Sequence, residues 1–479
     1  MRGCRAPFFL QCPALGLLIA TLFAGCQSLD PSGDLARAEY LAQSRHEAIA
    51  SEAAMPSWRG DGPLSRELAI EIALQRAPEA IAIRPAIATA RAALAEASLP
   101  PNPSFRWLVG VPVDPAEALP LFLGLAQDLG YLLQRDALIE VAQLGLESEV
   151  VAAAQVLVEI AHRIERLHRE VALAEALEVV ARDRETVTAS QFALARDREA
   201  VGEGTPSETA LAKAALQAIV ATRAEADRVV RRAKLALLLA MGRPGLSLDW
   251  NTTLPNQPDL ILIEQVSSAL RAAPDSESAL LTIAFANRLD LLAADLSACS
   301  RFEAMGVAAR SIWDSLSIGV AFDRDMEGMR GVPFSGSIPI PIFDDGSVPR
   351  ARAEAAWQRS MIDRFALAQT IEAEVRGAWI DRSAAAEMLA ARVEELERVE
   401  AALATQRDAY EGGFASLESV LALEVRRLDS IESTVEAEAA VALGDIELRR
   451  AIGGVAGSSV EVAEDAVARE VRALPESNS

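Results

Sequence analysis

Three residues on one predicted helix have the side chains best suited to chemistry in this sequence: His162, Glu165 and His168. Imidazole and carboxylate groups bind divalent metals and transfer protons near neutral pH. Either use requires the side chains to converge. Positions six apart on an α-helix point about 240° away from each other, so the two histidines should diverge. The spacing therefore favours polar residues on a helical surface over a metal or catalytic site.

The rest of the sequence has no other catalytic signature. We find no nucleophile motif and no phosphate-binding loop, so the sequence predicts neither an enzyme nor a bound cofactor or metal. The formal net charge of -23 at pH 7 excludes nucleic acid as a partner, because nucleic acid needs a basic face. Cys299 stands alone after Cys26, so no disulfide framework is predicted, and we expect Cys299 to be an inert core residue.

The N-terminus has the features of a secreted lipoprotein. Arg2 and Arg5 precede an apolar segment at 14–23, which is the order found in a secretory signal. Ala24-Gly25-Cys26 then resembles a bacterial lipobox, which predicts that Cys26 is acylated, for example with palmitate. Gln27 follows in place of Asp, as in lipoproteins that are sent on to the outer membrane. The alternative is an ordinary signal peptide that is cleaved elsewhere.

Short strands and very long helices must position any functional residues. From Ser335 to Arg350 the pattern changes from one to the other: Ile338, Ile340 and Ile342 alternate with serine and proline, which predicts a strand. N-cap residue types follow, and Pro349 fits a first helical turn. No proline interrupts the chain from there to Tyr410, which predicts a helix of about 65 residues. No apolar run beyond the signal reaches 18 residues, so a membrane-spanning part would have to be a closed β-barrel.

The same order of elements occurs twice, which predicts an internal two-fold repeat and a mostly α fold with a small β part. The predicted segments are the signal peptide (1–25), an N-terminal linker (26–63), a first repeat (64–244, with a helix, a strand pair at 104–129 and a helical hairpin at 131–241), a second repeat (245–453, with a helix, a strand pair at 311–343 and a hairpin at 346–452) and an acidic tail (454–479). We expect the tail to be disordered because it has few apolar residues to bury.

Five motifs in this order resemble the TolC-like outer membrane efflux family, over roughly residues 64–453: Leu64-Ser-Arg-Glu-Leu-Ala-Ile-Glu-Ile-Ala-Leu-Gln-Arg-Ala-Pro78, Leu99-Pro-Pro-Asn-Pro103, Val201-Gly-Glu-Gly204, Ile338-Pro-Ile-Pro-Ile-Phe-Asp-Asp-Gly346 and Tyr410-Glu-Gly-Gly413. The proline-isoleucine motif and the segment Gly319-Val-Ala-Phe-Asp323 look most like the cobalt–zinc–cadmium resistance branch, of lipoprotein type.

The resemblance implies an architecture and a function. Three identical chains would each give four strands to one 12-stranded β-barrel, and their long hairpins would form an α-barrel through the periplasm. The trimer would be the passive exit duct of a tripartite efflux system, anchored in outer membrane lipid, with heavy-metal cations as the cargo that this branch suggests. Its partners would be a periplasmic adaptor (membrane fusion) protein and an inner-membrane pump.

The resemblance also implies that the two glycine turns dock the adaptor. Glycine at a helix tip exposes backbone and lets a partner approach closely. We therefore expect Gly204, Thr205, Gly413 and Phe414 to make this contact.

A second implied site is the closed periplasmic entrance. Relatives often carry two aspartates that ring this entrance, on the helix after the second turn, and the matching positions here look like Ser419 and Ala422. The neighbouring Glu418 and Glu424 are therefore the candidates for a gate. The alternative is that both glutamates face solvent between the helix pairs.

A different class of function stays open, namely a lipid-anchored periplasmic coiled-coil scaffold without a pore. Its support is a 3,4-spaced apolar seam of Leu157, Ile160, Ile164, Leu167, Val171 and Ala174. A scaffold, however, needs no strand pairs with an apolar outer face, and the sequence places such pairs in both repeats.

Overall fold

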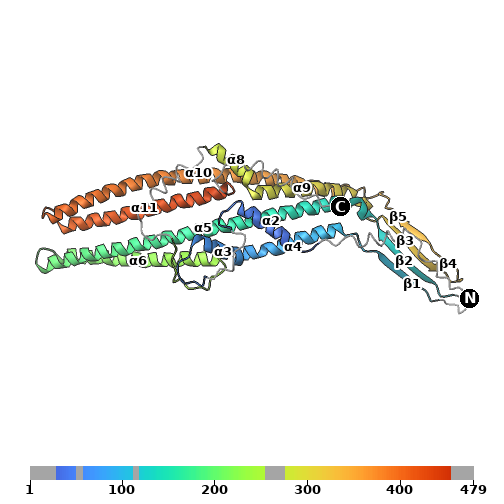
Figure 1. The fold of residues 1–479 in the computed structure, drawn as a ribbon, viewed down its shortest axis with the longest axis horizontal. Helices are drawn as coiled ribbons and strands as arrows, with labels where there is room; N and C mark the ends of the chain where they lie inside the picture. The colour runs from blue at the N-terminus through green and yellow to red at the C-terminus, as the bar shows by residue number, and fades with distance from the viewer. Residues whose placement is uncertain (1–27, 50–57, 112–117, 254–275, 455–479) are drawn as a thin grey trace, which may run out of the picture. The chain divides into compact units, whose positions relative to one another are not determined.

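The computed structural model describes residues 28–49, 58–111, 118–253 and 276–454, which form long helices and one small sheet (Figure 1). They belong to two compact units. The sheet unit lies within 28–35, 84–150 and 292–365, and the helical unit lies within 36–83, 151–291 and 366–454. Cys26 and the predicted signal peptide lie outside the described residues, as does the acidic tail beyond 454. Among the described helices, none combines the length and apolarity needed to span a membrane.

Five antiparallel strands make up the sheet: β1 (Ser104–Val109), β2 (Leu121–Asp128), β3 (Ser317–Arg324), β4 (Arg330–Gly331) and β5 (Phe334–Ser337). β2 and β3 lie at the centre and pair from Leu121↔Arg324 to Asp128↔Ser317, so the two repeats of the sequence meet there. β1 pairs with β2, while β4 and β5 pair with β3. Within the described strands, each outer strand therefore keeps one edge without a partner.

Large apolar side chains on the outer strands are exposed to an unusual degree. Phe105 and Trp107 on β1 are 64% and 66% exposed, and Phe334 on β5 is 82% exposed. Single exposed apolar residues are common on protein surfaces, but a group of aromatic residues on one small sheet marks a surface that another apolar phase or molecule covers.

The strand predicted through Ile338, Ile340 and Ile342 is wrong, because β5 already ends at Ser337. Pro339 and Pro341 have no backbone N–H to donate to a sheet ladder, which explains why pairing stops before them. The three isoleucines are 69%, 76% and 72% exposed in the segment without regular secondary structure that leads to α10. The alternation in the sequence is real, but it belongs to unpaired chain.

The described helices are α2 (Ser32–Gln43), α3 (Arg66–Arg76), α4 (Pro78–Ser98), α5 (Gly130–Ala200), α6 (Pro206–Ala240), α8 (Glu277–Asn287), α9 (Leu289–Arg310), α10 (Ser347–Glu411) and α11 (Leu417–Ala451), with a short 3₁₀ turn η1 (Ser311–Trp313). α5 and α6 form one antiparallel hairpin, and α10 and α11 form the second (Figure 1). The predicted fold class, mostly helical with long hairpins and a small sheet, is confirmed.

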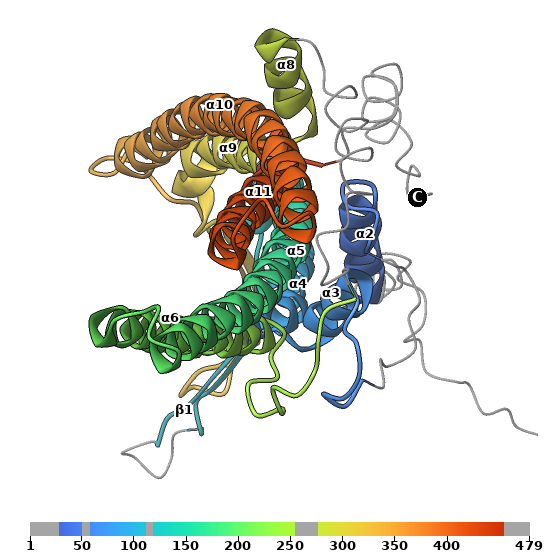
Figure 2. The same cartoon turned by 90° about the vertical axis from the view of Figure 1, so that its left-hand side faces the viewer.

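Apolar side chains join the two hairpins inside the helical unit. Five of the six residues of the predicted seam on α5 are buried, and Leu167 is partly exposed. Further along, Val180 on α5 and Leu396 on α10 pack with Leu428, Ile431 and Val435 on α11. Figure 2 shows α11 between α5 and α10, so α11 is the helix through which the two repeats share one core.

Two further predictions need correction. The one helix expected before the first strand pair is two helices, because Ala77 has an extended backbone (φ -61°, ψ 136°) before Pro78, which starts α4. A residue before proline disfavours the helical region for steric reasons. Cys299 was predicted to lie in the core, but it is exposed on α9, since that helix buries other positions such as Ala298.

Candidate functional site

The turn between α5 and α6 is closed by its own backbone. Gly202 has φ +81°, and the N–H groups of Glu203 and Gly204 both donate to the carbonyl of Arg198, at 2.9 and 3.0 Å. Thr205 then caps α6: its hydroxyl accepts from the Glu208 N–H, and the Glu208 carboxylate accepts from the Thr205 N–H at 2.9 Å. This capping box and the left-handed glycine fix a tight tip whose backbone lies at the surface.

The turn between α10 and α11 uses the same device. Gly413 has φ +76°, and the N–H groups of Phe414 and Ala415 both donate to the Ala409 carbonyl, at 2.8 and 3.2 Å. Ser416 caps α11 by accepting from the Ser419 N–H. Phe414 is 91% exposed, so the tip carries an uncovered aromatic ring. The four predicted docking residues thus lie on two rigid tips, where Gly204 alone is partly covered.

The two predicted gate glutamates are ion-paired within the protomer. Glu418 is 72% exposed in its side chain and lies 3.0 Å from Arg198 at the end of α5. Glu424 is 13% exposed and lies between Arg407 of α10 and Arg427 of α11, the latter at 3.1 Å. Neither carboxylate is an isolated negative charge. An exposed pair such as Glu418–Arg198 contributes about 0–1 kcal/mol, so it can break at little cost.

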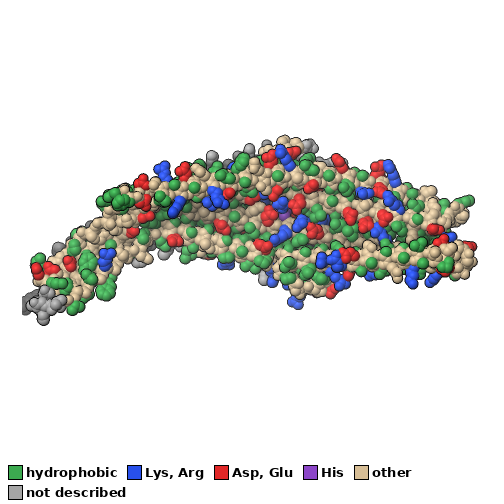
Figure 3. All heavy atoms as spheres, turned by 180° about the vertical axis from the view of Figure 1, so that it is seen from behind, with side chains coloured by type: hydrophobic (Ala, Val, Ile, Leu, Met, Phe, Trp, Pro, Cys, Tyr) green, Lys and Arg blue, Asp and Glu red, His purple; other side chains and the backbone are tan. Residues whose placement is uncertain are grey.

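Ion pairs between α5 and α11 continue along the two helices. The pairs are Glu165–Arg449, Arg169–Glu438, Arg184–Glu432 and Arg198–Glu418, with N–O distances of 2.9, 3.7, 2.5 and 3.0 Å. Residue numbers rise on one helix as they fall on the other, so the helices are antiparallel. Figure 3 shows charges of both signs mixed along the helical surface. These pairs select the register of the two helices, while the apolar contacts supply the stability.

The prediction that His162, Glu165 and His168 lie on a helical surface is wrong, since they are 3%, 4% and 3% exposed. The predicted divergence of the two histidines is nevertheless correct. His168 Nε2 is 2.9 Å from the carbonyl of buried Leu64, and it donates there as the Nε2–H tautomer. Glu165 instead accepts from Arg66 of α3 and Arg449 of α11, both at 2.9 Å on Oε1.

The segment after α2 covers this part of α5, a contact that the sequence did not reveal. His46 Nε2 lies 3.4 Å from Glu165 Oε2, and the His46 and His162 rings pack edge to face with centroids 4.8 Å apart. Helical periodicity relates neighbours on one helix, so it could not place a residue from another segment. The one signal in the sequence was composition: the chain has three histidines, and His46 and His162 are two of them.

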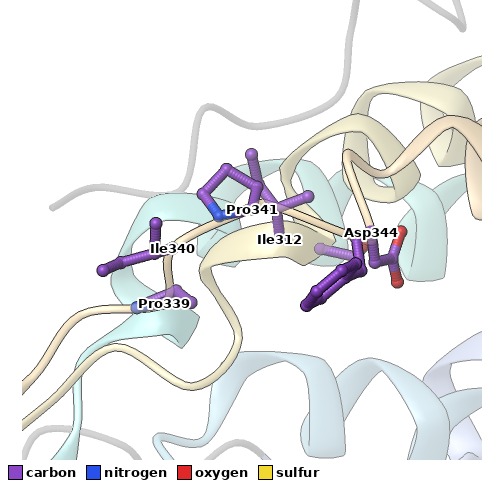
Figure 4. Close-up of a pocket in the computed structure, with 7 residues that line it drawn as sticks. Ile312, Pro339, Ile340, Pro341 and Asp344 are labelled. Atoms are coloured by element: carbon purple, nitrogen blue, oxygen red, sulfur yellow. The ribbon is translucent and has the colours of Figure 1, made fainter.

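A cavity of about 350 Å³ lies at the start of α10 and is lined by Ser311, Ile312, Pro339, Ile340, Pro341, Phe343 and Asp344 (Figure 4). Asp344 accepts from the Gly346 N–H at 3.0 Å, which shapes the turn into the helix. Gly346 has φ +77°, and a Cβ there would lie 2.9 Å from Ile312. The lining has one titratable group and no converging set, so it is a feature of the turn and does not form a chemical site.

Comparisons with solved structures find proteins of the same fold. CusC, whose structures describe transmembrane channel formation, matches with a TM-score of 0.63 and 17% identity, over 85% of this chain and 99% of CusC. The outer membrane protein VceC of Vibrio cholerae matches with a TM-score of 0.62 and 19% identity, over 82% of this chain and 97% of VceC. The outer membrane channel MtrE of Neisseria gonorrhoeae matches with a TM-score of 0.59 and 17% identity, over 81% and 88%.

Searches against protein-family descriptions and curated protein sequences find no match. At these identities the likeness concerns the fold. The chain shares its fold with solved outer membrane channel proteins, as the sequence motifs predicted.

Acid should destabilise the helical unit through His168. Burial lowers the pKa of His168 below its ordinary value of 6.5, although the Leu64 carbonyl and nearby Glu67 act in the opposite direction. Below pH 6.5 the unfolded chain therefore binds a proton that the folded chain does not. The unfolding free energy should fall by up to about 1.4 kcal/mol per pH unit below this point.

Urea unfolding at pH 7 and pH 5, in a metal chelator, measures this loss. His168→Gln keeps a donor for the Leu64 carbonyl and does not titrate, so the variant should lose less stability on acidification than the parent. An equal loss in the two proteins would show that His168 does not contribute.

Proposed function

We propose that this chain is one protomer of an outer membrane channel that acts as the passive exit duct of an efflux system. The observation that carries the proposal is the fold, which CusC shares over 85% of this chain. No catalytic step is part of this function. The direct cellular test is deletion of the gene followed by complementation: the deletion strain should accumulate the exported compound, and the intact chain should restore export.

The open sheet edges support a homotrimer. β1 and the β4/β5 side each keep an unpaired edge in the described protomer, and such edges pair readily with another strand. In lipid every backbone N–H and C=O must be bonded, so the sheets of several copies must close on one another. The exposed Phe105, Trp107 and Phe334 fit a surface that lipid covers. Cross-linking of the purified protein should give a limiting species of three chains.

The remaining parts of the assembly follow from the same proposal. An adaptor and an inner-membrane pump would supply substrate and energy, because the sequence has no phosphate-binding loop of its own. Heavy-metal cations are the proposed cargo, supported by the motif Ile338–Phe343 and the Gly319–Asp323 segment. Growth of the deletion strain on cobalt, zinc and cadmium salts, compared with growth on organic toxicants, tests this cargo class.

Acylation of Cys26 is the proposed anchor at the outer membrane. The support is the sequence Ala24-Gly25-Cys26 after a secretory signal, and several acyl chains give stable anchoring at about 0.8 kcal/mol per buried CH₂. Mass spectrometry of the mature N-terminus should show a lipid-modified cysteine, and Cys26→Ala should abolish the modification. An unmodified terminus at another residue in the parent protein would contradict this anchor.

The proposed adaptor contact is formed by the two tips, with Gly204 and Thr205 on one and Gly413 and Phe414 on the other. Support comes from the rigid, exposed backbone of both tips and from the uncovered ring of Phe414. Phe414→Asp should reduce export at least about tenfold, since an exposed aromatic anchor can carry more than 1.4 kcal/mol of binding free energy. Trimer formation should be unchanged because the ring packs against little within the protomer.

Phe414→Leu is the matched control and should keep most of the export, because it retains an apolar side chain. Export is measured in the complemented deletion strain, and trimers are measured on gels. Parent-like export by Phe414→Asp would remove this residue from the proposed contact.

The entrance is proposed to be narrowed at the start of α11 by Glu418 and Glu424. Three-fold symmetry would repeat each glutamate three times and would make rings of carboxylates, which favour cations. The ion pairs of both glutamates with arginine moderate this charge, so breaking the pairs also loosens the helix ends. Glu418→Gln should lower cation selectivity in planar bilayers, because it removes the more exposed charge. Glu424→Gln should mainly raise conductance, because it breaks the ion pair with Arg407 and so loosens the adjoining ends of α10 and α11.

Arg196→Gln is a suitable control, since Arg196 is exposed near the end of α5 and pairs with its neighbour Asp197. It should leave selectivity and conductance unchanged. If both glutamate variants conduct and select as the parent does, these residues do not form the gate.

A pore-free scaffold is the competing function, and the sheet argues against it. A periplasmic scaffold would expose the aromatic residues of β1 and β5 to water without benefit. Such a scaffold would also remain in the aqueous fraction once Cys26 is replaced, whereas the channel should remain in the membrane through its sheet.

A further inference from the structure

A group of buried metal-ligand side chains lies in the helical unit and has no role in export. His46, His162 and Glu165 each offer one ligand atom, and these atoms all lie within 4.8 Å of one another. Their side chains are 4%, 3% and 5% exposed. His46 comes from the segment after α2, whereas His162 and Glu165 are one turn apart on α5. The cluster therefore joins two parts of the chain that are distant in sequence.

Four polar atoms of the cluster lack a hydrogen-bond partner among the described residues: His46 Nε2, His162 Nδ1, His162 Nε2 and Glu165 Oε2. Burying one such atom without a partner costs about 1–3 kcal/mol. Scattered exceptions occur in proteins, but four at one point are unusual. His46 accepts from the Ala48 N–H through Nδ1, so its Nε2 carries the ring proton and lies 3.4 Å from Glu165 Oε2. The convergence of these ligand atoms indicates an absent electron-pair acceptor, which would replace that proton.

We propose that His46, His162 and Glu165 bind one late first-row divalent cation, of the Zn²⁺ or Co²⁺ type, with water as a fourth ligand. Tetrahedral bonds of about 2.0–2.2 Å separate neighbouring ligand atoms by roughly 3.3–3.5 Å. His46 Nε2 and Glu165 Oε2 are 3.4 Å apart, which already fits. His162 Nδ1 lies 4.0 Å from the same oxygen, so a small rotation of this side chain completes the site.

The protonation states suit a metal. Burial, with His46 and two arginines nearby, lowers the pKa of His162 to about 3, so its ring is neutral and has a free lone pair. Burial alone would raise the pKa of Glu165, but His46 and the arginines outweigh it and lower this pKa to about 2. The ion must displace one contact: with metal on His46 Nε2 the ring proton moves to Nδ1, and the Ala48 N–H, 3.3 Å from Nδ1, has to turn away.

The arginines position the carboxylate, although their charge opposes a cation. Arg66 and Arg449 both donate to Oε1 of Glu165, which leaves Oε2 turned toward the histidines. Carboxylate ligands of metals are commonly held in this way by their second oxygen. Arg66 is itself paired with Glu67 at 2.9 Å and with Glu47 at 3.3 Å, so its positive charge is already offset.

The donor set decides the class of ion. Two imidazoles and one carboxylate suit Zn²⁺ and its neighbours, whereas Ca²⁺ and Mg²⁺ require six or more oxygen ligands and Cu⁺ prefers sulfur. The site does not depend on the channel function. Its structural effect is to attach the segment after α2 to α5, at buried positions of the helical unit that lie away from the two tips.

Metal binding to the untagged, detergent-purified full protein tests the proposal. After removal of metal with a chelator, Co²⁺ titration should give the intense visible bands of a four-coordinate site, with one ion per protomer, and Zn²⁺ should displace it. Zn²⁺ should also raise the melting temperature, and the chelator should reverse this rise.

His46→Gln and His162→Gln should each weaken Co²⁺ binding by about 100-fold or more. The reason is that loss of a residue that only hydrogen-bonds to a metal ligand already lowers metal affinity by about 10–100-fold. His168→Gln is the matched control, since His168 is equally buried on α5 but bonds Leu64, and it should bind Co²⁺ as the parent does. The proposal is overturned if the parent binds no stoichiometric Co²⁺, or if binding survives both cluster variants. A water molecule in place of the ion at high resolution, after Zn²⁺ addition, would also overturn it.

Discussion

The antiparallel contact between α5 and α11 is the constraint on which the helical unit depends. Helices of 71 and 35 residues cannot hold their conformation in water through propensity alone, so each must bury an apolar face. Val180 on α5 meets Leu428, Ile431 and Val435 on α11, and ion pairs flank this core on both sides. Because α5 belongs to the first repeat and α11 to the second, this one contact turns two hairpins into one body. The apolar contacts stabilise the packed helices, and the ion pairs select one register of α5 against α11.

The long helices could be predicted from the sequence because their signals are local. α5 begins at Gly130, one residue before the predicted start of the hairpin at 131, since glycine, proline and capping residues act within a few positions. The end of β5 could not be predicted from alternation, because Ile338–Ile342 alternates as well as any strand does. What ends the strand is the missing N–H of Pro339 and Pro341, and this matters only once a neighbouring strand is in place.

The candidate sites also divide into local features, which could be predicted from the sequence, and contacts between distant segments, which could not. The tips at Gly204 and Gly413 could be found from the sequence because a left-handed glycine after a long helix, here Gly202 or Gly413, is a local feature. The arginine partners of Glu418 and Glu424 could not be found, since Arg198 and Arg407 lie on other helices. The cluster around Glu165 was hidden for the same reason. Its members come from the segment after α2 and from α5, and the arginines that bind Glu165 come from α3 and α11. Only the folded chain brings them together.

In the proposed function, the chain is part of a channel whose wall is made by packed helices and whose sheet is completed by other copies. Single-channel recording of the purified oligomer in planar lipid bilayers tests this claim most directly. The account predicts discrete conductance steps that require the assembled trimer and disappear when the trimers are dissociated. Intact trimers that insert into the bilayer and show no conductance, under any pH or salt condition that preserves the fold, would contradict it.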